Sequence, residues 1–262
     1  MAAPAWLMAR PVAHRGLHDR DAGRIENTLP AADAAIARGL PVECDLQLTA
    51  DGVPVVFHDD ELDRLAEASG PVATRSLAAL RAIPLRGTAA RIPTLADFVA
   101  TIAGRVPLFA EFKSRFDQDR RLEAAAAPLL AAYSGPLAVM SFDPDSVRTL
   151  GTLLPEVPRG LIADGYTDPE WDFIPPLRRL ALRHLASVPA IAPDFLAYAV
   201  YDLPAAGPAA LRAAGMPLLT WTVRSEADRA TAARCADQII FEGFDPALTG
   251  TASAGSAGTR SA

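Results

Sequence analysis

The chain has 262 residues, half of them hydrophobic, and this length corresponds to one large domain or two small ones. Such a composition can bury a sizeable core, which excludes a disordered or collagen-like chain. The 25 Lys and Arg residues against 31 Asp and Glu residues give a net charge of -6, which argues against nucleic-acid binding through a broad basic face.

The cysteine content and the apolar runs bear on the cellular compartment. Cys44 and Cys235 are far apart in sequence, so we expect free thiols in a reducing compartment rather than a disulfide scaffold. No run approaches the roughly twenty apolar residues of a transmembrane helix, and residues 1–13 lack the apolar segment of a secretory signal. We therefore expect a cytoplasmic protein without stable membrane anchoring, and we see no amphipathic basic helix.

Short apolar runs alternate with longer amphipathic segments in the first half of the chain. Strands are predicted at residues 10–14, 41–49, 53–58 and 106–113, and helices at 29–38, 77–82 and 94–103. Gly39 is suited to end the first helix, and Thr94 with Asp97 three residues later is typical of a helix start. The turn at residues 51–52 predicts a hairpin-like pair of strands.

The second half repeats this alternation. Strands are predicted at residues 136–142, 159–163, 190–194, 217–223 and 237–241, and helices at 121–133, 144–154, 176–186, 203–215 and 226–235. Roughly eight strand–helix units in about 250 residues predict a closed (β/α)₈ barrel, with a doubly wound open sheet as the alternative. We assign residues 1–248 to this domain and interpret the small, polar residues 249–262 as a disordered tail.

Polar residues follow several predicted strands, at the barrel end where active sites lie. Nucleotide-binding glycine motifs and a nucleophile elbow are absent from the sequence. The candidate residues are His14, Arg15, Glu43, Asp45, His58, Glu111, Lys113 and Trp221.

Three of these candidates are carboxylates, and they would repel one another without a cation between them. Glu43 and Asp45 are two residues apart and so share one strand face, whereas Cys44 points to the other face and is expected in the core. Together with Glu111 they favour Mg²⁺ or Ca²⁺, both of which prefer oxygen ligands. A solvated strand face paired with Arg is the alternative.

Two of the four histidines, His14 and His58, stand at predicted strand ends beside the carboxylates, as a general acid and a general base require. We expect His184 to be structural. For His18, in the loop after the first strand, a structural and a functional role both stay open, with a surface position favoured. Arg15 and Lys113 carry the positive charge that suits a phosphate group.

The order of these motifs resembles that of the glycerophosphodiester phosphodiesterases. The matching segments are His14-Arg15-Gly16, Glu26-Asn27-Thr28, Glu43-x-Asp45, the turn 49–52 with residues 55–59 (VVFHD), Leu62-Asp63-Arg64, 92–95 (IPTL), Glu111-x-Lys113, Ser141-Phe142 and Trp221-Thr222-Val223. The resemblance covers about residues 10–246. It implies a (β/α)₈ barrel with a small insertion after the second strand that hydrolyses glycerophosphodiesters to glycerol 3-phosphate and an alcohol.

The resemblance also implies residue roles. It makes His14 and His58 the acid–base pair, the three carboxylates the ligands of a divalent metal, and Arg15 and Lys113 the phosphate-binding residues. Glu26 and Asn27 would support them, and Trp221 would contact substrate. Lys113 and Asn27 are the only Lys and the only Asn in this Arg-rich and Ala-rich chain, and both fall within the motifs.

Two departures from the family pattern stand out. Ile25 replaces the usual Pro, and residues 241–246 (FEGFDP) replace a Thr-Asp-x-Pro segment. The alternatives to the expected function are a phosphodiesterase acting on intact phospholipid or lysophospholipid, and a non-catalytic barrel.

Overall fold

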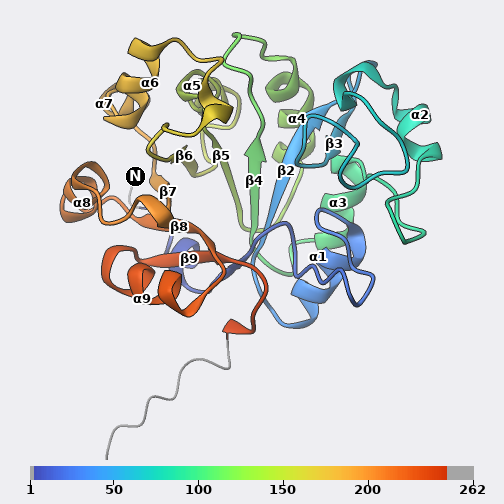
Figure 1. The fold of residues 1–262 in the computed structure, drawn as a ribbon, viewed down its shortest axis with the longest axis horizontal. Helices are drawn as coiled ribbons and strands as arrows, with labels where there is room; N and C mark the ends of the chain where they lie inside the picture. The colour runs from blue at the N-terminus through green and yellow to red at the C-terminus, as the bar shows by residue number, and fades with distance from the viewer. Residues whose placement is uncertain (1–2, 247–262) are drawn as a thin grey trace, which may run out of the picture.

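The structure, a computed structural model, describes residues 3–246, so the predicted tail at 249–262 lies outside the described residues. Eight parallel strands form one closed sheet surrounded by helices (Figure 1). The barrel strands are β1 (Val12–Ala13), β2 (Val42–Leu48), β4 (Leu108–Phe112), β5 (Leu137–Ser141), β6 (Arg159–Ala163), β7 (Phe195–Ala199), β8 (Leu218–Val223) and β9 (Gln238–Phe241). The predicted (β/α)₈ barrel is confirmed.

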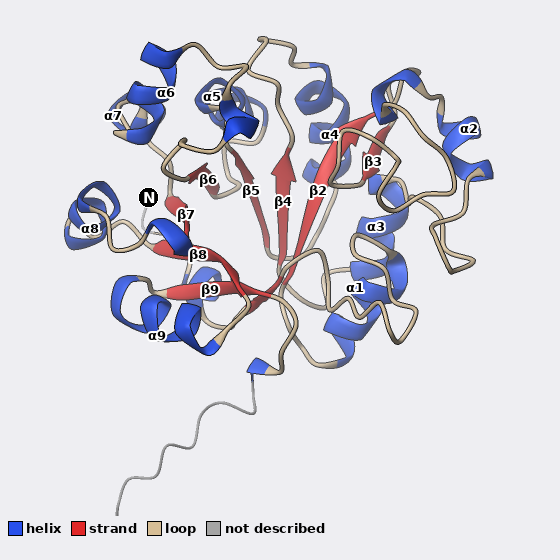
Figure 2. Ribbon diagram, in the orientation of Figure 1, coloured by secondary structure: helices blue, strands red, loops and turns tan. Residues whose placement is uncertain are grey.

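Strand β1 closes the barrel because it pairs with both β2 and β9. The helices that follow the strands form an outer ring (Figure 2). They are α1 (Leu29–Ala37), α3 (Leu95–Ile102), α4 (Arg121–Ala131), α5 (Pro144–Leu153), α6 (Pro176–Arg183), α7 (Val188–Ile191), α8 (Ala206–Ala213) and α9 (Glu226–Cys235). No helix within residues 3–246 is both long and apolar enough to cross a membrane.

Residues between β2 and α3 project from the ring beside the mouth of the barrel (Figure 1). This segment contains β3 (Pro54–Val56), which pairs antiparallel with β2 as the hairpin pattern predicted, and α2 (Leu77–Ala82). It has its own small core, which includes Phe57, Leu62 and Leu80 and also buries Ile25.

One predicted strand is wrong. Residues 190–194 include the end of α7, a left-handed turn at Ala192 and then Pro193, and the strand begins instead at Phe195. Strand β7 lies between β6 and β8 and is buried at every position, so its sequence has none of the polar alternation that marks a half-exposed strand. The predicted helix at 203–215 begins later, at Ala206, after a short 3₁₀ turn at Val200–Asp202.

The alternation along β2 decides which side chains face the barrel interior. Val42, Cys44 and Leu46 belong to the apolar core that includes residues of the surrounding helices, as expected for Cys44. Because neighbouring side chains on a strand point in opposite directions, Glu43 and Asp45 face inward. The barrel interior below them is filled by apolar residues that include Phe109 and Phe195, whose rings lie 6.3 Å apart.

Gly160 provides a test of this packing. A Cβ atom built there would lie 2.2 Å from a ring carbon of Phe195, which is fully buried and cannot move aside. We expect Gly160→Ala to lower the free energy of unfolding by about 1–3 kcal/mol, measured by urea denaturation. The control is Gly207→Ala, where the nearest atom is a flexible Leu185 methyl at 3.3 Å; equal stability of the two variants would contradict the packing.

Candidate active site

A cavity of about 880 Å³ opens at the carboxyl ends of the barrel strands. It is lined by His14, Arg15, Glu43, His58, Glu111, Lys113 and Trp221, all of which the sequence singled out. Asp45, Glu26 and Asn27 do not line it: Glu26 contacts Arg15, Asp45 contacts Lys113, and Asn27 contacts Asp45. The fold therefore brings the candidate residues of five different strand ends to one place.

The three carboxylates form one buried cluster. Asp45 and Glu111 are paired in register on adjacent strands, and Glu43 lies two residues before Asp45 on the same strand face. One oxygen from each lies within 4.8 Å of the others, and Glu43 Oε1 is buried without a hydrogen-bond partner. Burial and the adjacent Asp45 and Glu111 raise the pKa of Glu43. Such a donor set fits a hard divalent cation, which would hold all three carboxylates in their charged form.

Lys113 and Arg15 carry the positive charge beside this cluster. The Lys113 ammonium lies 2.9 Å from Asp45 Oδ1 and 2.7 Å from Glu111 Oε1, in ion-pair contact without hydrogen-bond alignment. Burial opposes the charge on Lys113, but the two carboxylates raise its pKa above the usual value. The Arg15 backbone N–H donates to Glu43 Oε2 at 2.9 Å. The positive charges of Lys113 and Arg15 therefore partly balance the negative charges of the carboxylates. Both side chains also face the cavity.

Asn27 holds Asp45 in place from behind the cavity. Its Nδ2 donates to Asp45 Oδ2 at 2.7 Å, and its Oδ1 accepts the Asp45 backbone N–H at 3.2 Å. Arg15 and Asn27 both have positive φ angles, 55° and 58°, and a backbone hydrogen bond joins them. Non-glycine residues rarely adopt this conformation, and such strain is concentrated at functional sites.

A chain of ion pairs links Arg15 to His58. Glu26 accepts from Arg15 at 2.5 Å and also from Arg64, whose guanidinium reaches Asp59 at 2.6 Å. Burial opposes ionisation of Glu26, but Arg64 and Arg15 lower its pKa to about 2. Asp59 in turn contacts His58 Nδ1 at 2.7 Å. Arg64, in the segment that follows β3, thus connects both sides of the site.

Both candidate catalytic histidines have a carboxylate at Nδ1. His14 Nδ1 lies 2.5 Å from Glu242 Oε2, and its Nε2 lies 4.0 Å from Glu43 Oε2. In each ring the proton therefore belongs on Nδ1, which leaves Nε2 for proton transfer. Burial lowers the pKa of His14 to about 4 in spite of the hydrogen bond to Glu242, so this imidazole is neutral near pH 7 and can accept a proton.

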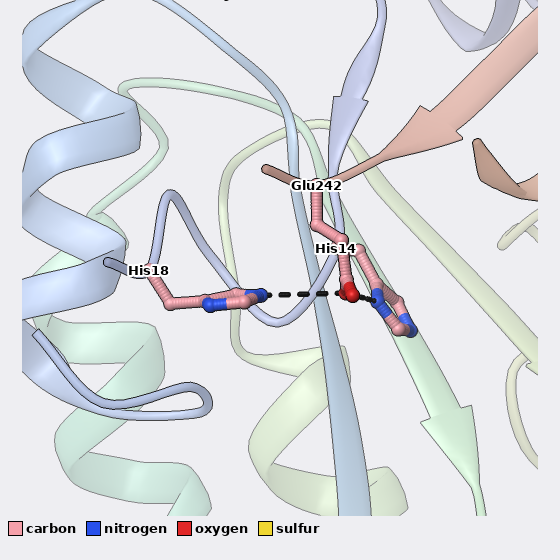
Figure 3. Close-up of side chains that lie close together, drawn as sticks. All are labelled: His14, His18 and Glu242. Atoms are coloured by element: carbon pink, nitrogen blue, oxygen red, sulfur yellow. Dashed lines mark hydrogen bonds and ion pairs between the residues drawn. The ribbon is translucent and has the colours of Figure 1, made fainter. Parts of the chain in front are cut away.

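Glu242 is the site residue that sequence reasoning missed. Figure 3 shows it between His14 and His18, and Arg224 Nε contacts its other oxygen at 2.6 Å. Burial opposes its ionisation, but these partners hold its pKa well below the usual range. The only signal was its position in the segment 241–246, which departs from the family pattern. His14, His18 and Glu242 could group around a metal, but the guanidinium already at Glu242 disfavours a second cation there.

The two remaining histidines differ in environment. His18 was expected at the surface, but it is only partly exposed and its Nε2 lies 3.4 Å from Glu242 Oε2. His184 is exposed at the end of α6 and does not line the cavity. Trp221 does line it, and its Nε1–H donates to the Ala197 carbonyl at 3.1 Å.

The comparisons with known proteins agree with this geometry. Relatives by sequence include YhdW of Bacillus subtilis, named as a glycerophosphodiester phosphodiesterase, which is 31% identical over 160 residues covering 58% of this chain and 64% of that protein. The "probable glycerophosphodiester phosphodiesterase 1" of Mycobacterium tuberculosis is 49% identical over 71 residues, 27% of this chain. These alignments span from a quarter to under two thirds of the relatives' length.

Solved structures share the fold over nearly the whole chain. An Oleispira antarctica phosphodiesterase in complex with the product sn-glycerol-3-phosphate has a TM-score of 0.74 at 23% identity, covering 90% of this chain and 93% of that chain. A Silicibacter pomeroyi protein described as a glycerophosphoryl diester phosphodiesterase has a TM-score of 0.73 at 24% identity, covering 92% and 91%.

The sequence model of the glycerophosphoryl diester phosphodiesterase family matches residues 14–243, which include every candidate site residue and Glu242. The match covers well over half of the chain and begins and ends at the two strand ends that meet in the His14–Glu242 contact. This protein therefore belongs to the glycerophosphoryl diester phosphodiesterase family.

Proposed function

We propose that this protein hydrolyses glycerophosphodiesters to glycerol 3-phosphate and an alcohol. The observation that carries the proposal is that two cationic side chains, two imidazoles and two carboxylates line one cavity, with the third carboxylate, Asp45, in the same cluster. Family membership supports the same reaction class. The alternative of a non-catalytic barrel is disfavoured, because the chain carries a suitable residue at every position expected to hold an acid, a base or a metal ligand.

In this proposal Glu43, Asp45 and Glu111 hold a divalent cation, Mg²⁺ or Ca²⁺. The ion would supply Lewis acidity and neutralise charge on the phosphodiester oxygens. Arg15 and Lys113 bind the same phosphate group, and their charge stabilises the negative charge that develops at phosphorus. Trp221 lines the space that the rest of the substrate occupies.

His14 and His58 act as the acid–base pair. One imidazole accepts a proton from the nucleophile, either water or the 2-hydroxyl of the glycerol, and the other donates a proton to the leaving alkoxide. The carboxylates of Glu242 and Asp59 orient the two rings through Nδ1. Asn27 and Glu26 act as positioning residues for Asp45 and Arg15.

The test of the function is the release of glycerol 3-phosphate from glycerophosphocholine and glycerophosphoethanolamine, followed with purified protein and added Mg²⁺ or Ca²⁺. We expect turnover with at least one of these substrates. Absence of glycerol 3-phosphate under every metal condition would overturn the proposal.

Removal of the metal should abolish activity, because the three carboxylates repel one another without it. We expect exhaustive chelation to stop turnover and re-addition of the cation to restore it. Asp45→Asn should weaken cation binding measured by calorimetry. The control is Glu170→Gln, which removes a cavity carboxylate outside the cluster. Full turnover after chelation would contradict the metal assignment.

Loss of either imidazole should lower the rate. We expect His14→Ala and His58→Ala each to reduce kcat by roughly 10²- to 10⁴-fold, the range for removal of a general acid or base, with the circular dichroism spectrum unchanged. The matched control is the exposed His184→Ala. A comparable loss in that control would mean that the pair is wrongly assigned.

Glu242 should affect kcat rather than KM, since it contacts the imidazole of His14 and does not line the cavity. We expect Glu242→Ala to lower kcat by roughly 10-fold or more, as for other carboxylates that orient a functional imidazole, and Glu242→Asp to retain more activity. His18→Ala removes the other imidazole at the same carboxylate and serves as the control. If both alanine variants behave alike in steady-state kinetics, the orienting role fails.

A further inference from the structure

The two histidines of the site are held by different parts of the fold. His14 directly follows β1, and its backbone N–H donates to the Phe241 carbonyl of β9 at 3.0 Å, so the barrel sheet itself fixes its position. His58 lies two residues beyond β3, a strand that is added beside β2 and is not part of the closed barrel. The His58 side chain is 33% exposed, against 11% for His14. The position of His58 therefore depends on support other than barrel pairing.

The backbone pairing of β2 with β3 stops just before His58. Leu46 is paired with Val56, the last residue of β3, and one further hydrogen bond runs from the Phe57 N–H to the Asp45 carbonyl at 2.9 Å. The Phe57 ring is buried in the small core of the segment that follows β2. Strand pairing and apolar packing thus fix the chain up to Phe57, one residue short of the imidazole.

The side chain of Gln47 continues the support past this point. Its Nε2 donates to the Phe57 carbonyl at 2.9 Å and to the Asp59 carbonyl at 2.7 Å. A glutamine amide has two N–H donors, and here the carbonyls on either side of His58 use both. Gln47 is only 7% exposed, so water competes little for these hydrogen bonds. The backbone is therefore held on both sides of the imidazole.

The position of Gln47 on β2 connects His58 to the carboxylate cluster. Glu43, Asp45 and Gln47 are spaced two residues apart and so lie on one face of the strand. The first two belong to the carboxylate cluster, and the third holds the segment of His58. One rigid strand thus sets the distance between the cluster and the imidazole. A general acid or base must lie within hydrogen-bond reach of the reacting group, so this distance affects the rate.

We propose that Gln47 is a positioning residue that acts through His58, keeping the imidazole at a fixed place relative to the carboxylate cluster. This inference rests on the proposed function, in which His58 belongs to the acid–base pair. Gln47 and Asp59 have complementary effects on the imidazole. The Asp59 carboxylate, 2.7 Å from His58 Nδ1, orients the ring, whereas Gln47 fixes the backbone that carries it.

Substrate binding is the alternative role, because Gln47 also lines the cavity. Both donors of its amide already point to backbone carbonyls, which leaves only the acceptor oxygen Oε1 for a substrate. The oxygens of an ionised phosphodiester carry no proton, so an acceptor oxygen gives them no favourable hydrogen bond. The direction of the amide therefore favours positioning over binding.

The experiment uses Gln47→Met, which keeps the length of the side chain and removes both donors without adding charge beside the carboxylates. With glycerophosphocholine or glycerophosphoethanolamine as substrate, we expect kcat to fall roughly 10-fold or more at nearly unchanged KM, because a misplaced acid or base loses rate rather than binding. In a His58→Ala background the same substitution should change kcat by less than about twofold, because the group through which Gln47 acts is gone.

Gln238→Met is the matched control. Gln238 lies on β9, its Nε2 donates to the Met8 carbonyl at 3.0 Å, and it does not line the cavity. We expect this variant to keep the wild-type kcat, and urea denaturation of both variants separates lost stability from lost positioning. Gln47→Asn is the second variant should Gln47→Met fail to fold. Its amide is one methylene too short to reach both carbonyls, so the same loss of kcat at unchanged KM is expected.

The possible results separate this inference from the proposed function. A raised KM at unchanged kcat would assign Gln47 to substrate binding and overturn the inference. An unchanged kcat, or an equal fold-loss with and without His58, would also overturn it, because Gln47 would then not act through the imidazole. Each of these results requires a wild-type protein that releases glycerol 3-phosphate and so leaves the proposed function standing. A wild-type protein without this activity would overturn both.

Discussion

Closure of the barrel by β1 is the constraint on which the rest of the structure depends. This strand has only two residues, Val12 and Ala13, yet it pairs with β2 on one side and β9 on the other. The closed sheet has no free edge apart from the added strand β3, so the backbone groups of the barrel strands are paired with neighbours. Closure also sets His14, at the end of β1, beside Glu43 and Glu242, which belong to opposite ends of the chain.

Charge balance is the second constraint, and it follows from that closure. Three buried carboxylates face one another at the barrel mouth, and burial of a charge is costly unless it is compensated. Arg15 and Lys113 provide part of the compensation in the protein itself. Arg64 extends the balance outward by joining Glu26 to Asp59, so the segment after β3 contributes to a site that lies on the barrel. The site is thus a network in which negatively charged carboxylates alternate with positively charged Arg and Lys side chains.

The apolar side of the barrel mouth is formed by other strands of the same barrel and by the loops that follow them. Strands β5 to β8 end in residues such as Met140 and Ile162, which continue the apolar barrel interior upward. The loops after β5 and β6 add aromatic rings that pack against one another through their edges or tilted faces. The cavity therefore combines the charged ends of β1, β2 and β4 with this apolar surface, and Glu170 and Arg224 add charge from the loops after β6 and β8.

Periodicity and turn residues were enough to predict most of the fold. The β6 and α9 segments were predicted with the observed bounds, because each is a clear apolar or amphipathic run between turn residues. The Thr94 start of α3 was also predicted, and it forms a full capping box with Asp97. The strand β7 was misplaced, because a strand buried on both faces has no alternation to reveal it.

The candidate site, like the fold, was predicted from the sequence only in part. The sequence by itself determined the barrel class and the residues at the strand ends, because spacing along a strand decides which side chains share a face. Tertiary structure alone decided which of them meet: the pairing of β1 with β9 brings Glu242 to His14 across 228 residues of sequence. It also decided that Phe142, which follows β5, lies against Trp171, which follows β6. Such contacts depend on strand order and loop packing, which no local pattern contains.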